Sequence, residues 1–161
     1  MQDLILATQW IHVLLALKAP DDQEFSARME HLLAELGRSK IAYLHEDELR
    51  SLGGSCAIPL AKYIAAERPA EEKRQQVEAA RILADLAPSW AIPDLIQLLS
   101  NPNGEVRGHV ARALQRLTGQ TQGRPAEEWR TAAWAQSAPT QRFWEQWWDQ
   151  NKERYPARPG R

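Results

Sequence analysis

The sequence predicts an all-α protein, a solenoid of short helices arranged as helical hairpins. Apolar residues recur three or four positions apart along nearly the whole chain, which is the spacing of helices that bury one face. No segment shows the period-two alternation of β-branched residues that a strand requires. A unit of about thirty residues, long enough for two helices, also occurs more than once, and repetition at that period is typical of solenoids.

The composition indicates a single domain over residues 1–161 with balanced charge. The chain has 20 Lys and Arg against 21 Asp and Glu, a formal net charge of −1. This balance gives no reason to expect nucleic acid or an anionic membrane as the partner. The one cysteine, Cys56, cannot form an internal disulfide, which is in keeping with a reducing compartment. We therefore expect a cytoplasmic protein.

Residues 1–20 are expected to form an N-terminal capping helix. The opening MQDLILATQWIHVLLALK is apolar enough to resemble a signal peptide. It carries Asp3, however, and it lacks the basic start and the small-residue cleavage site of such a peptide. The run is also short, and Gln9 and His12 interrupt it, so it does not suit a membrane span. The pattern favours a buried first helix.

Residues 21–54 are interpreted as a degenerate repeat that begins with an amphipathic helix. Asp21 followed by Glu24 indicates a capping box, and Gly37 suits the C-terminal cap. The apolar stripe of this helix consists of Phe25, Met29, Leu32 and Leu36. Beyond it, glycines and prolines divide the chain into short helical pieces, at Gly53, Gly54, Pro69, Pro88, Pro102, Gly119, Gly123 and Pro139.

The repetition is clearest over residues 55–119, which we interpret as two repeats. Residues 51–64 align with residues 85–98 at an offset of 34, and residues 78–87 align with residues 109–118 at an offset of 31. Matched pairs include Ser55 and Ser89, Ala57 and Ala91, Pro59 and Pro93, Arg81 and Arg112, and Leu83 and Leu114. The difference between the two offsets falls in the turn between helices.

The segment AIPDLIQLLSNPNGEVRGHVARALQRLTG resembles a HEAT repeat. It has Pro93 inside the first helix, an Asn-Pro-Asn turn, then Val106 and Arg107 before a second helix rich in Ala and Leu. Residues 55–87 match more weakly, with Gln75-Gln76 in place of Val-Arg. The resemblance implies a right-handed α-solenoid of stacked helical hairpins, an armadillo-type superhelix that serves as a protein-interaction scaffold. A few relatives bind nucleic acid or act on tetrapyrroles.

Residues 120–152 are expected to form a Trp-rich C-terminal cap, followed by a flexible tail over residues 153–161. This part is similar to the ending of some bacterial HEAT-repeat proteins, where a Thr-Gly-Gln-x-x-Gly turn precedes a Trp-rich helix. On a helical wheel one continuous arc is formed by Phe143, Trp144, Trp147 and Trp148. A terminal repeat needs a cap with a polar outer face, which this helix would supply.

Two further tryptophans, Trp129 and Trp134, are assigned to a preceding helix that packs into the same seam. Trp129 is therefore grouped with Trp144, Trp147 and Trp148 as a structural residue. The alternative is an aromatic platform for bases or peptides, which would leave the rings in solvent with cationic residues interleaved. Few cationic residues are close to the cluster, so the cap is the favoured interpretation.

Polar ridges on the second helices of the two repeats are the expected partner-binding surface. The six residues are Glu78, Arg81, Asp85, His109, Arg112 and Arg116. The simplest account of such ridges is a solvated surface with ion pairs worth a few tenths of a kcal/mol each. In HEAT arrays, however, second helices line the concave face, and the resemblance therefore implies that these ridges face a ligand.

Arg107 and Pro93 are expected to be structural. The helical wheel places Arg107 near Leu114, on the packed side, and a buried guanidinium needs acceptors. In HEAT repeats the matching arginine reaches carbonyls or a carboxylate inside the array. The candidate carboxylate here is Asp94.

No motif for catalysis, for a metal or for a cofactor stands out. The chain has no Gly-rich phosphate loop, no His-Glu-x-x-His and no paired cysteines. The segment HEDELR, residues 45–50, offers one histidine without a second ligand at helical spacing. Cys56 aligns with Trp90, which indicates a packing position. We therefore expect no enzyme activity, no catalytic residue, no metal and no cofactor.

The function predicted is non-catalytic binding of another protein, through the concave face or an edge. Two alternatives stay open. A nucleic-acid-binding module would need a stripe of positive charge, whereas each ridge here alternates in sign. A lyase-like or chaperone-like module acting on a bound chromophore would need a deep apolar cleft.

Overall fold

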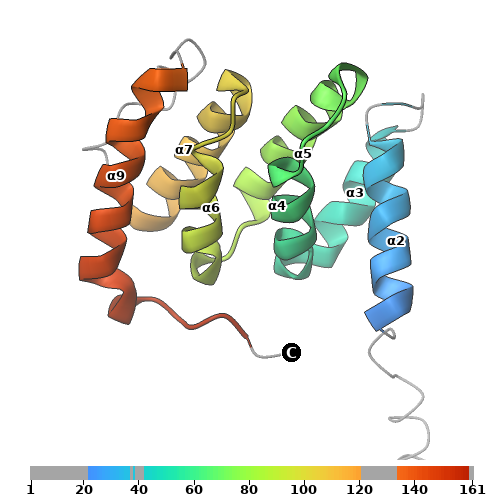
Figure 1. Ribbon diagram of the computed structural model, residues 1–161. Coiled ribbons are helices and arrows are strands. Elements are labelled where there is room, and N and C mark those ends of the chain that lie inside the picture. Colours follow the sequence, from blue (N-terminus) through green and yellow to red (C-terminus); the bar gives the residue numbers. More distant parts are fainter. Residues whose placement is uncertain (1–21, 37, 39–41, 121–133, 160–161) are drawn as a thin grey trace, which may run out of the picture. The chain divides into compact units, whose positions relative to one another are not determined.

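The computed structural model describes residues 22–36, 38, 42–120 and 134–159 (Figure 1). These residues form helices and turns, with no strand among them, so the all-α prediction is confirmed. The chain divides into two compact units, residues 1–31 and residues 32–161. The capping helix expected over residues 1–20 lies outside the described residues.

Helix α2 (Asp22–Glu35) is the amphipathic helix expected at the start of the degenerate repeat. Three members of its predicted stripe, Met29, Leu32 and Leu36, are buried, and Phe25 is half-buried. The two residues predicted to cap this helix, at positions 21 and 37, are outside the described part.

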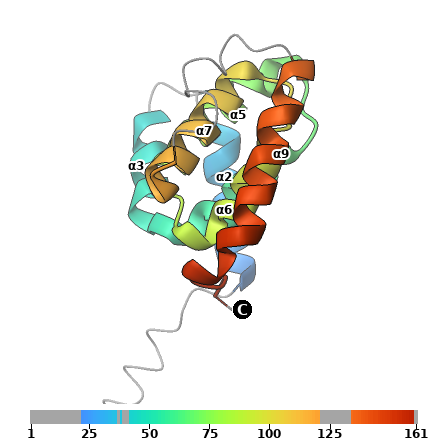
Figure 2. The same ribbon diagram turned by 90° about the vertical axis from the view of Figure 1, so that its left-hand side faces the viewer.

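The second unit contains two layers of helices. One layer consists of α3 (Ala42–Leu52), α5 (Lys73–Leu86) and α7 (Gly104–Thr118), and the other of α4 (Ala57–Ala65), α6 (Ile92–Leu98) and α9 (Trp134–Asn151). Neighbours within a layer contact each other, α3 with α5, α5 with α7, α4 with α6 and α6 with α9. Across the layers α4 packs on α5 and α6 packs on α7 (Figures 1 and 2).

The offset of 34 in the sequence corresponds to equivalent elements in the structure. A short 3-10 helix, η1 (Gly53–Cys56), leads into α4, and another, η3 (Ser89–Ala91), leads into α6. Pro59 and Pro93 lie in the first turns of these two α-helices. Proline suits that position because its fixed φ is helical and the backbone N–H it lacks would have no partner within the helix.

Helix α7 is bounded by residues whose side chains or backbone suit a helix end. The Asn103 side chain accepts a hydrogen bond from the backbone N–H of Glu105 at 2.9 Å, which caps the N-terminus. Gly119 follows the last turn with φ of 68°, a left-handed conformation that glycine adopts without steric cost. The Asn-Pro-Asn turn thus starts this helix and the glycine ends it.

The core of the second unit lies between the two layers. It is made of aliphatic side chains that are almost fully buried, among them Leu60, Ile64, Ile82, Leu83, Ile92, Leu95, Val110 and Leu114. Burial of each such side chain is worth about 1.5–3 kcal/mol, so this seam dominates the stability of the array.

Helix α9 differs from the sequence prediction in two respects. Trp134, assigned to a preceding helix, is the first residue of α9, and the helix continues through Pro139, where a break was expected. A proline inside a helix removes one backbone hydrogen bond and crowds the preceding turn. Beyond it, Thr140 and Trp144 are buried, and such tertiary packing can outweigh one lost bond.

Candidate functional site

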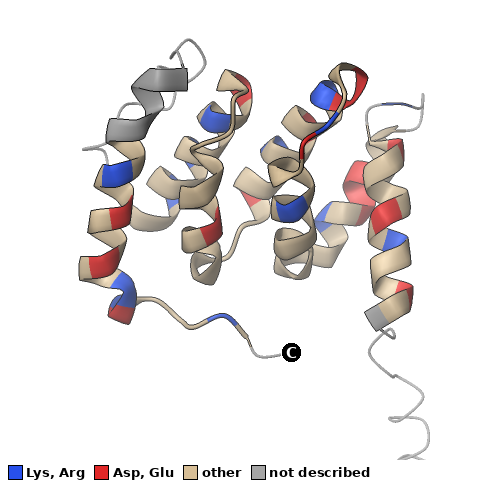
Figure 3. Cartoon of the chain, viewed as in Figure 1, with Lys and Arg blue, Asp and Glu red and all other residues tan. Residues whose placement is uncertain are grey.

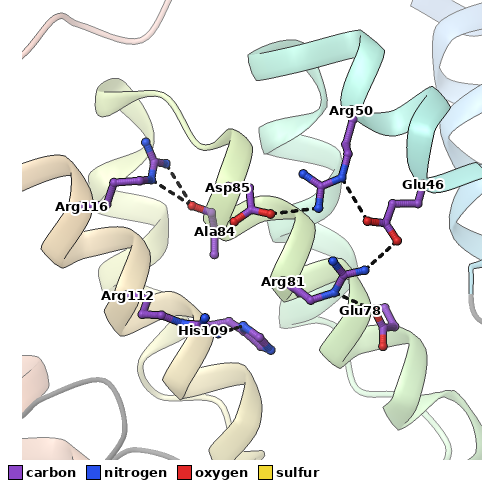
Figure 4. A network of polar contacts seen from close by, with 9 residues as sticks. All are labelled: Glu46, Arg50, Glu78, Arg81, Ala84, Asp85, His109, Arg112 and Arg116. Carbon is purple, nitrogen blue, oxygen red and sulfur yellow. Dashed lines mark hydrogen bonds and ion pairs between the residues drawn. The ribbon is translucent and has the colours of Figure 1, made fainter. Parts of the chain in front are cut away.

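The six predicted partner-binding residues lie on α5 and α7, two adjacent helices of one layer (Figure 4). Glu78, Arg81 and Asp85 follow one another along α5. His109, Arg112 and Arg116 take the positions 31 residues later on α7. The structure therefore brings the two rows together, and it adds residues from α3 that the sequence did not point to.

The α5 row is bound to α3 by ion pairs. Arg81 Nη2 donates to Glu46 Oε2 at 2.6 Å and Arg81 Nε donates to Glu78 Oε2 at 3.0 Å. Arg50 Nε donates to Glu46 Oε1 at 3.0 Å, and its Nη2 donates to Asp85 Oδ2 at 2.9 Å. We call these five residues the α3–α5 ion-pair network (Figure 4).

The ion pairs shift the ionisation of the residues in the network. The hydrogen bond from Arg81 lowers the pKa of the Glu46 carboxyl, although partial burial acts in the opposite direction. The hydrogen bond to Asp85 raises the pKa of Arg50, and the hydrogen bond to Glu46 raises that of Arg81. Each of these three shifts favours the charged form of the residue concerned.

Glu46 and Arg50 belong to the HEDELR segment, which sequence reasoning considered only as a metal site. The described residues contain no group of three His, Cys, Asp or Glu side chains that could hold a metal ion. Glu46 and Arg50 instead form ion pairs with Arg81 and Asp85 of α5. Glu46 and Arg50 are four residues apart on one face of α3, and this spacing could have indicated an ion pair between them.

The α7 row has a different set of partners. Arg112 Nη2 donates to His109 Nδ1 at 2.5 Å, which requires that this ring nitrogen carry no proton. Arg116 donates to main-chain oxygens, from Nη2 to Ala84 and Ala87, both at 3.0 Å, and from Nε to Ala84 at 3.2 Å. These carbonyls end α5, so Arg116 ties the two helices together.

Arg107 is 1% exposed and lies on the packed side of α7. Its Nη1 donates to the carbonyl oxygens of Asn101 and Pro102, both at 2.8 Å. Burial lowers the pKa of this guanidinium. Asp94, the acceptor suggested by the sequence, pairs with Arg158 instead. The carbonyls that accept from Arg107 lie in the turn between α6 and α7, a proximity that a helical wheel cannot show.

Gln76 is a buried polar residue that sequence reasoning passed over as a mismatch. Its Nε2 donates to the carbonyl oxygens of Tyr63, Ile64 and Ala66 at 3.4, 3.1 and 2.8 Å. The Asn101 side chain donates to the Ile64 carbonyl as well, at 3.1 Å. The end of α4 is therefore joined both to α5 and to the turn after α6.

The aromatic residues of α9 form a chain of ring contacts. Trp144 is 2% exposed, whereas Trp147 and Trp148 are half-buried. Trp144 and Trp147 meet edge to face with ring centroids 5.6 Å apart, and Trp147 and Trp148 both contact Tyr155. Trp129 lies outside the described residues, and so does the side chain of Trp134.

The segment expected as a flexible tail includes a residue that contacts α6. The Arg158 guanidinium pairs with the Asp94 carboxylate and lies 5.8 Å from the centroid of the Trp90 ring.

Trp90 aligns in sequence with Cys56, which is buried and donates from Sγ to the Gly53 carbonyl at 2.9 Å. Burial raises the pKa of this thiol to about 11.

Charge elsewhere on the protein is mixed. Figure 3 shows basic and acidic residues interspersed over the described helices. Within the described ranges, no helix has the length and apolar character needed to cross a membrane.

Comparison with known proteins supplies the family. Residues 60–133 match the model for HEAT repeats. No curated protein and no solved structure matches the chain. The matched segment begins in α4, takes in α5, α6 and α7, and covers most of the two repeats that the sequence alignment identified. Together with the all-helical structure, this match shows that the chain contains HEAT repeats.

Proposed function

We propose that this chain is a non-catalytic, cytoplasmic scaffold that binds another protein. In this proposal α4 with α5 and α6 with α7 are stacked hairpins of a short right-handed α-solenoid. The binding surface is the face formed by α3, α5 and α7. HEAT repeats are commonly protein-interaction modules, which supports the class of function.

The observation that carries the proposal is the placement of the two polar rows. Side chains at equivalent repeat positions, Arg81 on α5 and Arg112 on α7, lie on adjacent helices of one layer. The α3–α5 ion-pair network holds part of this face in a fixed arrangement, since Arg81 is bonded to carboxylates on two helices. A surface whose side chains are already positioned loses less entropy when a partner binds.

The same contacts argue against a catalytic role for these residues. The carboxylates of Glu46, Glu78 and Asp85 each accept a hydrogen bond from an arginine. A general acid or base needs a pKa near the working pH, whereas the pKa of Glu46 is lowered. A nucleic-acid interface is also disfavoured, because carboxylates on α3 and α5 interrupt the basic residues and would repel a phosphate backbone.

Site-specific photo-crosslinking tests the proposed face. A photoreactive amino acid replaces Arg74 on α5 or Glu105 on α7, which are both exposed, or Gln97 on α6 as the control on the other layer. In lysate of the source organism, we expect one protein to be captured from positions 74 and 105 but not from position 97. The purified partner should then bind the unmodified chain. Equal capture from position 97 would contradict this assignment of the surface.

A further inference from the structure

The equivalent arginines Arg81 and Arg112 differ in what neutralises them. Arg81 donates to two carboxylates, Glu46 on α3 and Glu78 on its own helix. The position that Glu78 occupies on α5 is taken by His109 on α7, and its Nδ1 is an uncharged acceptor for Arg112. Among the described residues, Arg112 therefore has no carboxylate partner, and its side chain is exposed.

The charge changes at the next position of the row as well. Asp85 on α5 corresponds to Arg116 on α7, whose hydrogen bonds within the described residues go to the carbonyl oxygens of Ala84 and Ala87 at the end of α5. The sequence of α7 contains one acidic residue, Glu105, in its first turn. It lies seven residues before Arg112, about 10 Å along the helix axis. The C-terminal half of α7 thus presents two guanidinium groups and no carboxylate.

We propose that Arg112 anchors an acidic segment of the protein partner, with Arg116 adding to the positive potential beside it. This inference rests on the proposed function and names the chemistry of the partner. A partner carboxylate at Arg112 would supply the negative charge that Glu46 and Glu78 supply at Arg81. Arginine suits this role because its planar guanidinium can donate two parallel hydrogen bonds to one carboxylate.

The α3–α5 ion-pair network limits where the acidic residues of such a segment can lie on this face. Three carboxylates, Glu46, Glu78 and Asp85, are shared between two guanidinium groups, so the α3–α5 side has an excess of negative charge. A continuous phosphate backbone would be repelled there. A peptide with acidic residues over α7 and neutral or basic residues over α5 matches both parts of the face.

Fluorescence anisotropy with the full chain tests this proposal. The probes are three labelled peptides of equal length, rich in glutamate, in serine or in lysine, together with a single-stranded oligonucleotide of the same charge as the acidic peptide. We expect the acidic peptide to bind most tightly, with an affinity that falls as salt is added. Arg112→Glu should weaken it about tenfold or more, because a charge-assisted bond is replaced by repulsion.

Matched variants distinguish loss of the Arg112 charge from a general effect of the substitution on the fold. Arg112→Lys should keep part of the affinity, because it keeps the charge but loses the two parallel bonds. Arg142→Glu, the charge reversal at an exposed residue of α9, should leave the affinity within about twofold. The proposal is overturned if the acidic peptide fails to bind, if Arg112→Glu binds it as well as the wild type, or if the oligonucleotide binds more tightly. A partner captured by crosslinking on α5 and α7 but insensitive to Arg112→Glu would overturn this inference and leave the proposed function standing.

Discussion

Gln76 and Arg107 lie 31 positions apart, and each donates to main-chain carbonyl oxygens in or just before the connection that leads into its own helix. Gln76 on α5 donates to the end of α4, and Arg107 on α7 donates to the turn that ends α6. Both side chains are buried. Carbonyls at the end of a helix and in the turn that follows have no partner within the helix, so a donor from the next helix satisfies them and fixes the two helices together. The two repeats thus share a structural role at this position, a buried donor to main-chain carbonyls, although the residue types differ.

We expect Arg107→Ala to destabilise the fold by about 2 kcal/mol or more, because it leaves the carbonyls of Asn101 and Pro102 without their buried donor. Urea denaturation would measure the change. Arg112→Ala is the matched control, since it removes the same side chain from an exposed position of the same helix, and it should cost less than about 0.5 kcal/mol. Equal denaturation midpoints for the two variants would contradict the structural role of Arg107.

Arg107→Gln is a second test of the relationship with Gln76. A glutamine at this position is shorter than arginine but keeps a donor, as at the equivalent place on α5. We therefore expect a stability between those of the wild type and Arg107→Ala. If Arg107→Gln were no more stable than Arg107→Ala, a glutamine at position 107 would not stabilise the fold as we expect from Gln76.

The α3–α5 ion-pair network predicts a pH dependence of stability. The pKa of Glu46 is lowered in the folded state, so its contribution is complete above the ordinary glutamate pKa and is lost as the pH falls through the lowered value. Thermal unfolding should show the wild type losing its advantage over Glu46→Gln below about pH 4. The advantage at neutral pH should be under about 1 kcal/mol, because these side chains are partly exposed.

Asp47→Asn is the control for that measurement. It removes one carboxylate from the adjacent, exposed position of α3, so it reports the general effect of one charge. A difference between wild type and Glu46→Gln that stayed constant from pH 7 to pH 3 would show that the Glu46 carboxylate does not contribute through its charge.

Local patterns in the sequence were sufficient for the helical class and for the two repeats. Pro59 and Pro93, Arg81 and Arg112 align by simple offsets, and each pair occupies equivalent elements in the structure. These features depend on residues close together in sequence, where helical periodicity and turn chemistry act directly. Burial of Arg107 also followed from the helical wheel.

Contacts between helices were harder to infer. The bond between Glu46 and Arg81 joins residues 35 positions apart, and it depends on how α3 packs against α5. The sequence predicts a ligand-facing position for Arg116 but gives no sign of its bonds to the carbonyls of Ala84 and Ala87. A main-chain acceptor leaves no signal in the side-chain pattern. The role of Gln76 was missed for the same reason.

Cys56 is expected to be unreactive in the folded protein. Its thiol is buried with a pKa raised to about 11, so at pH 8 the thiolate fraction falls from about a quarter to about a thousandth. Reaction with a disulfide reagent should be slow in native buffer and fast in guanidinium chloride. Since folding favours the protonated thiol, stability should also decline as the pH rises above about 8.5. Rapid modification under native conditions would contradict this burial.

Deletion of residues 140–161 tests whether the aromatic cluster of α9 is a cap or a binding surface. Trp144 is almost fully buried, and α9 contacts α6. Burial of each large aromatic is worth about 2–3 kcal/mol, so we expect the truncated chain to lose several kcal/mol of stability. Native tryptophan emission should be blue-shifted in the full chain and move to the red after truncation. Removal of residues 156–161 alone is the control, and it should have a small effect.

Trp144→Ala and Trp148→Ala distinguish the two roles within the intact helix. Trp144 packs in the core, whereas Trp148 is half-buried against Tyr155 at a centroid distance of 5.6 Å. If α9 is a cap, Trp144→Ala should cost about 3–5 kcal/mol, and Trp148→Ala should cost clearly less, as measured by thermal and urea unfolding. If the cluster is instead a platform for a ligand, both variants would unfold where the wild type does and would lose partner binding. The burial of Trp144 favours the cap, because a side chain that is 2% exposed has almost no surface left to offer a ligand.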